Sequence, residues 1–162
     1  MTFVEELMTK LLRPPRVMLA ARDEPSGQTF VSALREQFEC DLDWVITGKH
    51  GVELINRKCY DIVFVDLSLA GDVPGKQLIK AIRQQKPSLP IVTMLDAESA
   101  DDFVEVVGCG LLGSMRKPLG NDDLNFDTIF RTYSIRAVSK QDTALTPFLA
   151  TSNSAHSALA NA

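Results

Sequence analysis

The sequence lacks any uninterrupted apolar run that approaches the ~20 residues a helix needs to cross a bilayer. It also lacks the pattern of a secretory leader, because Glu5 and Glu6 stand where a leader carries positive charge before an apolar stretch. These two absences predict a cytoplasmic protein that has no membrane partner.

Basic clusters are missing as well. The 162 residues carry 17 Lys and Arg against 21 Asp and Glu, which gives a formal net charge of −4 and a pI of about 5.2. A surface that collects nucleic-acid phosphates or anionic lipids needs the opposite balance of charge. We therefore expect no nucleic-acid partner, and look instead for a protein or a small ion.

Cysteine is scarce, and its spacing excludes the common metal and redox sites. Cys40, Cys59 and Cys109 form none of the C-x-x-C pairs that a zinc site or a thiol redox centre requires. Reduced thiols in a cytosolic protein are the simplest interpretation. The remaining composition, 45% hydrophobic and 23% charged, is that of a globular protein and excludes disordered, collagen-like and coiled-coil chains.

The chain divides into three expected segments. Residues 1–15 are predicted to form an amphipathic helical extension that stops at two prolines, and residues 16–137 have the length of one domain with its own core. Residues 138–162 lose the apolar periodicity and are rich in small residues, which predicts a disordered tail. The apolar residues of the first segment, at helical spacing, are Phe3, Val4, Leu7, Met8, Leu11 and Leu12.

Between residues 16 and 137, short apolar runs alternate with segments of helical periodicity. Alternation of this kind, with nearly continuous apolar strands, favours a parallel sheet covered by helices on both faces. Right-handed crossovers then predict an α/β fold, a flavodoxin-like (βα)5 three-layer sandwich with strand order 2-1-3-4-5. The expected strands are residues 17–21, 42–47, 62–65, 90–95 and 113–116, and the last helix is expected to start near Asn121.

Polar residues follow these strands at the carboxyl edge of the sheet, where ligands collect in such folds. Carboxylates grouped there suit a hard cation such as Mg2+, and a lysine beside them supplies charge for a phosphoryl oxygen. The residues concerned are Arg22, Asp23 and Glu24 after the first strand, Asp66 after the third, Asp96 after the fourth and Lys117 after the fifth.

In this order the motifs resemble the receiver domain of two-component response regulators over roughly residues 16–137. Residues 62–69 resemble the apolar strand that ends in the phosphoacceptor aspartate of that family. Residues 22–25 resemble its Asp-Asp-Glu-Pro acidic pair, and residues 116–119 its Lys-Pro-Phe turn. Residues 109–111 stand where the family has Ala-Gly-Ala.

The resemblance implies roles for individual residues. Asp66 would be the nucleophile that accepts a phosphoryl group, and Lys117 would bind the phosphoryl oxygens. Mg2+ would be held by Asp23, by the Asp66 carboxylate and by the main-chain carbonyl of Ser68. A cis peptide before Pro118 would aim the lysine into the site. Such a domain is not an enzyme beyond its own phosphorylation and dephosphorylation.

Three positions depart from the family pattern. Arg22 stands in place of the first acidic residue, Asp96 in place of Thr or Ser, and Ser114 in place of an aromatic residue. A guanidinium beside Asp66 is expected to weaken Mg2+ binding and to take the cation's place by pairing with a carboxylate. Ionised Asp96 would repel the phosphate, and Ser114 offers no ring to move when the domain is phosphorylated.

The resemblance also implies partners. A sensor histidine kinase or a histidine phosphotransfer protein would supply the phosphoryl group, and a downstream protein target would read it. Because only about 25 residues follow the last expected helix, too few for an output domain, we expect a single-domain receiver.

The contact surface follows from the same resemblance. The family docks partners through the last helix and the fifth strand, and either this surface or the N-terminal helix is the candidate for a homodimer contact. In this chain that surface would present some of Phe103, Val104, Leu124 and Tyr133, although each of these is also suited to pack on the sheet.

Two interpretations of the site remain open. In the first, Asp66 is phosphorylated with the help of Mg2+ and the domain signals by protein contact. In the second, the domain is a degenerate pseudo-receiver in which Asp66 only pairs with Lys117, and it acts as a phosphorylation-independent interaction module. A dehalogenase-type phosphatase is disfavoured because Ser68 replaces its second acid, and an FMN carrier because acidic residues follow the first strand.

Overall fold

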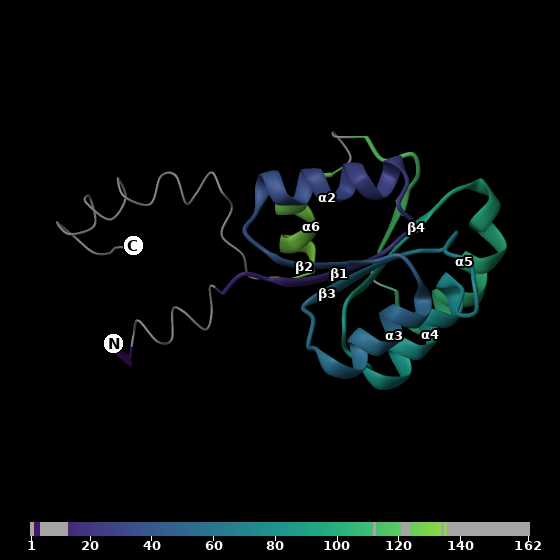
Figure 1. Ribbon diagram of the computed structural model, residues 1–162, viewed down its shortest axis with the longest axis horizontal. Helices are drawn as coiled ribbons and strands as arrows, with labels where there is room; N and C mark the ends of the chain where they lie inside the picture. The colour runs from purple at the N-terminus through teal and green to yellow at the C-terminus, as the bar shows by residue number, and fades with distance from the viewer. Residues whose placement is uncertain (1, 4–12, 112, 121–123, 134, 136–162) are drawn as a thin grey trace.

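The computed structural model describes residues 2, 3, 13–111, 113–120, 124–133 and 135 of the chain. A five-stranded parallel sheet lies at its centre, in the order β2-β1-β3-β4-β5, and confirms the predicted flavodoxin-like arrangement (Figure 1). The strands are β1 (Arg16–Ala20), β2 (Asp41–Val45), β3 (Ile62–Asp66), β4 (Ile91–Leu95) and β5 (Gly113–Arg116).

Helices cover both faces of the sheet and complete the three layers (Figure 1). One face carries α2 (Pro25–Gln37) and α6 (Phe126–Thr132), and the other carries α3 (Gly48–Arg57), α4 (Gly75–Gln85) and α5 (Ala100–Val106). Two short 3-10 turns flank α5, namely η1 (Ala97–Ser99) and η2 (Val107–Cys109).

Strand β3 divides the core into two layers. All five of its residues are buried, and because side chains alternate along a strand, Phe64 enters one layer and Val65 the other. In the layer under α2 and α6, Phe30 packs edge-to-face against Phe64 and Phe126, with ring centroids 4.7 and 5.0 Å away. The burial of β3 fixes Asp66, its last residue, at the edge of the sheet.

Two element boundaries differ from the sequence prediction by more than one residue, and helix caps explain both. Strand β2 ends at Val45 because Thr47 caps α3, its side chain accepting a hydrogen bond from the His50 amide. Helix α6 begins at Phe126 instead of near Asn121, because the Asn125 side chain accepts a hydrogen bond from the Thr128 amide.

The predicted terminal segments fall largely outside the described residues. Of the expected N-terminal helix, residues 4–12 are not described, and the same holds for the predicted tail from residue 138 onward. Among the residues that are described, no helix combines the length and the apolarity that a membrane span requires.

Candidate functional site at the carboxyl edge of the sheet

Asp66 lies at the carboxyl edge because it is the last residue of β3, between β1 and β4. The segments that follow these neighbouring strands therefore flank it, as predicted, and the loop after β5 adds Lys117. The Lys117-Pro118 peptide is cis, which confirms the expectation drawn from the family resemblance.

The Asp66 carboxylate is buried, with 1% of its side chain exposed, and both of its oxygens accept hydrogen bonds. Oδ1 accepts from the Ser68 amide at 2.9 Å and from the Ser68 hydroxyl at 2.8 Å, while Oδ2 accepts from Lys117 Nζ at 2.8 Å. A buried carboxylate needs such donors because it has left its hydration shell. Ser68 thus contributes its amide and its hydroxyl to the site, contacts that the sequence did not predict.

Lys117 is the centre of the charged network. Its ammonium donates to Asp66 Oδ2, to Ser68 Oγ at 3.0 Å and to Glu24 Oε1 at 3.2 Å, and 8% of its side chain is exposed. Burial acts to lower the pKa of Lys117, but the hydrogen bonds and negative charges of Asp66 and Glu24 outweigh it and hold the pKa above its ordinary value. Lys117 therefore carries a positive charge next to Asp66 at neutral pH.

Glu24 belongs to the site, although the sequence marked it only as part of an acidic motif. One of its oxygens accepts from Lys117 and the other accepts from the Arg22 guanidinium at 3.2 Å, so it bridges the two cations. The contact between Glu24 and Lys117 depends on side-chain conformation, so it could not be predicted from residue spacing. With Glu24 included, the strand-end residues have four carboxylates and two cations, a formal charge of −2.

Arg22 does not take the position beside Asp66 that the sequence suggested. Its side chain is 55% exposed, and the contact described for its guanidinium is the one with Glu24. Glu24 holds the guanidinium on the solvent side of the site because the two residues are close in sequence and opposite in charge. The cation next to Asp66 is therefore Lys117.

Asp96 has a structural role as a helix cap, which was not predicted from the sequence. It caps η1: its Oδ1 accepts from the amides of Glu98 and Ser99 at 3.0 and 3.1 Å, and from the Ser99 hydroxyl at 2.9 Å. The Ser99 hydrogen bond, together with the charge of Lys117 4.0 Å away, holds the pKa of Asp96 below its ordinary value. An aspartate just before a short helical turn is a recognisable capping signal.

Two further predicted residues are also placed. The Asp23 carboxylate accepts a hydrogen bond from the Gln28 side chain at 3.0 Å and lies at the exposed rim after β1. Ser114 is exposed on β5, opposite Thr93 in the register of the sheet.

The expected contact surface is only partly at the surface. Val104 is 71% exposed on α5, whereas Leu124 is fully buried and both Phe103 and Tyr133 are partly buried against the core. Val107, which the sequence analysis did not single out for this surface, is 52% exposed on η2.

The donor chemistry suits Mg2+, because Asp23 and Asp66 offer the hard carboxylate oxygens that this ion prefers. Both oxygens of Asp66 are already engaged by Ser68 and Lys117, however, so an ion must share or replace one of these contacts. Among the described residues, no group of three His, Cys, Asp or Glu side chains is arranged to hold a metal ion.

A family model, curated relatives and solved structures all match this chain to response regulators. Residues 17–127 match the family described as the response regulator receiver domain. The transcriptional regulatory protein ZraR of Escherichia coli (strain K12) is 26% identical over 130 residues, which are 78% of this chain and 29% of ZraR. The regulatory protein LuxO of Vibrio cholerae is 33% identical over 86 residues, or 53% of this chain and 19% of LuxO. The chain thus spans less than a third of either relative.

Among solved structures, a CheY-like response regulator receiver domain protein from Methanospirillum hungatei superposes with a TM-score of 0.65 at 17% identity. The match covers 76% of this chain and 96% of that chain. At this identity the likeness concerns the fold, and it agrees with the strand order described above.

Proposed function

The chain belongs to the response regulator receiver domain family, and on that basis we propose that Asp66 accepts a phosphoryl group in two-component signalling. The observation that carries the proposal is the contact between Asp66 Oδ2 and Lys117 Nζ, 2.8 Å apart at the carboxyl edge of the sheet. A nucleophilic carboxylate and a cation for the incoming oxygens are the two groups that phosphoryl transfer to aspartate requires.

In the proposed step, one oxygen of the Asp66 carboxylate forms a bond to the phosphorus of a phosphohistidine or a small acyl phosphate. The bond from phosphorus to the donor breaks, and its electron pair stays with the leaving group. The protein performs this reaction by positioning and by neutralising charge. Ser68 orients the carboxylate through Oδ1, and Lys117 faces the charge that develops on the phosphoryl oxygens.

Receiver domains generally bind Mg2+ at the phosphorylation site, and in this chain we assign it to Asp23, to Asp66 and to the main-chain carbonyl of Ser68. When bound, the ion supplies positive charge for the phosphoryl oxygens. We expect weak affinity for two reasons: Lys117 already pairs with Asp66, and Arg22 adds a second cation to the edge. Asp96, held as an anion by its cap, adds negative charge where the phosphate arrives.

A histidine kinase or a histidine phosphotransfer protein is the proposed donor, and a downstream protein the proposed target. Val104 and Val107 are the exposed apolar residues of α5 and η2 and contribute to the proposed contact surface, together with β5 and α6. The same surface is the candidate for a homodimer contact.

The test is the intact mass of the full chain after incubation with Mg2+ and acetyl phosphate. We expect a mass increase of one phosphoryl group that is absent without Mg2+ and absent from Asp66→Asn. The matched control is Asp127→Asn, which removes an exposed carboxylate on α6 and should leave the increase intact. An unmodified wild-type chain would overturn the proposal and leave the pseudo-receiver interpretation. An Asp66→Asn variant that is still modified would overturn it by placing the phosphoryl group on another residue.

A further inference from the structure

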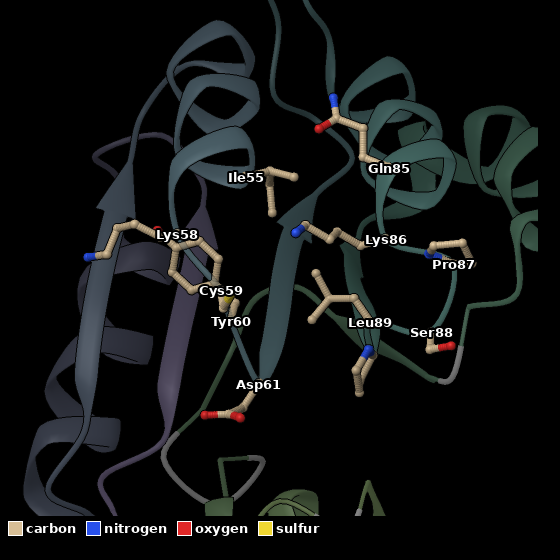
Figure 2. A pocket seen from close by; sticks show the side chains of 11 residues that line it. Ile55, Lys58, Cys59, Tyr60, Asp61, Gln85, Lys86, Pro87, Ser88 and Leu89 are labelled. Carbon is tan, nitrogen blue, oxygen red and sulfur yellow. The ribbon is translucent and has the colours of Figure 1, made fainter.

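A pocket of about 450 Å³ opens at the amino-terminal edge of the sheet, opposite the edge that carries Asp66 (Figure 2). It lies between the ends of α3 and α4 and the residues that lead into β3 and β4. Its apolar lining is made by Ile55, Tyr60, Pro87, Leu89 and Pro90, and it is large enough for a few side chains.

Hydrogen bonds from neighbouring side chains hold the walls of the pocket in place. The Arg83 guanidinium donates to the carbonyls of Lys86 and Pro87 at 3.0 and 2.8 Å, and to the Cys109 carbonyl at 2.7 Å. These bonds tie the segment after α4 to the end of η2. A wall fixed in this way loses little conformational entropy when an occupant binds.

The opposite wall is fixed in the same manner. Lys58 Nζ and Tyr60 Oη both donate to Asp43 Oδ2, each at 2.6 Å. Lys58 is therefore engaged with β2, whereas the Lys86 ammonium has no ion pair among the described residues. Lys86 is thus the pocket cation that is available to an acidic group of an occupant.

The chain itself approaches this pocket at Arg13. The Arg13 guanidinium donates two hydrogen bonds, of 2.9 and 2.8 Å, to the carboxylate of Asp61, which lines the pocket. The Arg16 amide donates to the same carboxylate at 2.7 Å. Because one residue spans at most about 3.6 Å, a segment that ends at Arg13 is tethered close to this wall of the pocket.

We infer that the pocket is the docking site of residues 7–12 of the same chain, which place the apolar side chains of Met8, Leu11 and Leu12 against its lining. The residues have the helical spacing of an amphipathic segment, and Glu5 and Glu6 complement the free charge of Lys86. Phe3, which is 77% exposed, stays outside the docked part.

Covalent attachment to the domain favours the docking of residues 7–12 even in a small pocket. A short linker raises the effective concentration of the segment to the millimolar range, so that weak contacts suffice for docking. The pocket lies at the edge opposite Asp66, and docking there does not depend on phosphorylation.

Cys59 supplies the test, because it is exposed and lines the pocket. The full chain is labelled with N-ethylmaleimide in short pulses, and peptide mass spectrometry gives the rate at each cysteine. We expect Met8→Asp combined with Leu11→Asp to raise the Cys59 rate about tenfold, the factor for a docked-to-free ratio of about ten. Cys40 and Cys109, which do not line the pocket, should keep their rates.

The matched control carries the same change in charge on the polar positions of the segment, Thr9→Asp with Lys10→Gln, and should label as the wild type does. Arg13→Ala, which removes only the anchor to Asp61, should raise the Cys59 rate severalfold.

Three results would overturn the inference. The first is an equal Cys59 rate in all four proteins, and the second is a uniform rise at all three cysteines, which reports a loosened domain. The third is protection of Cys59 that fades on dilution of the wild type, which would assign the pocket to a second copy of the chain.

Discussion

Replacing Lys117 by Met should destabilise the domain strongly, because it removes the cation from a buried carboxylate. Asp66 and Lys117 are 1% and 8% exposed, and their charged atoms are 2.8 Å apart. Removing one partner of such a pair typically costs about 3–5 kcal/mol, since the other charge stays buried and unpaired. The two Ser68 donors to Asp66 remain, so we expect a loss at the lower end, about 3 kcal/mol.

Neutralising Asp66 as well should rescue the stability that Lys117→Met loses. In the double variant Lys117→Met with Asp66→Asn, no charge is left unpaired at this position, and most of the lost stability should return. The control is Lys80→Met, which breaks an exposed ion pair with Glu105 and should change stability little.

Equilibrium unfolding in urea at pH 7 is the assay. The pKa of Lys117 is raised in the folded state, so its stabilising contribution is complete below the ordinary lysine value of about 10.4 and is lost as the pH rises through the folded pKa. Measurement at pH 7 therefore records the whole effect. A loss below about 1 kcal/mol for Lys117→Met, or no recovery in the double variant, would refute the account of the buried pair.

Three further variants test other parts of the structure. Thr93→Val should leave the free energy of unfolding unchanged or raise it by about 1 kcal/mol, since the buried Thr93 hydroxyl has no hydrogen-bond partner among the described residues; a clear loss in urea unfolding would contradict this. Arg83→Ala should cost about 2 kcal/mol because several carbonyls lose their donor, and an unchanged urea midpoint would disprove that role. The pKa of Asp96 is lowered, so its contribution is present above about pH 3.9 and fades as the pH falls through the folded value. The stability gap between wild type and Asp96→Asn should therefore shrink from pH 7 to pH 3, and a constant gap would count against it.

The sequence predicted the sheet well where burial dictates the residues. The run Ile62–Val63–Phe64–Val65 is apolar because β3 is covered on both faces, and the structure buries all of it. The end of β2 and the start of α6 were less predictable, because they depend on the caps Thr47 and Asn125.

The candidate site was predictable in its strand-end positions and not in its contacts. Asp66 and Lys117 follow directly from the order of the strands, and the structure brings them together. Glu24 and the Ser68 hydroxyl enter through side-chain conformations that no spacing encodes. Arg22 was expected beside Asp66, but its neighbour Glu24 holds it nearer to solvent, so local pairing overrides the expectation from strand position.

Chemical localisation of the phosphoryl group shows whether Asp66 carries it. An aspartyl phosphate is reduced by borohydride to homoserine, which peptide sequencing by mass spectrometry assigns to one position. After incubation with acetyl phosphate and Mg2+, followed by borohydride, we expect homoserine at position 66. Homoserine at another aspartate, or unmodified Asp66 in a chain that has bound Mg2+, would contradict it.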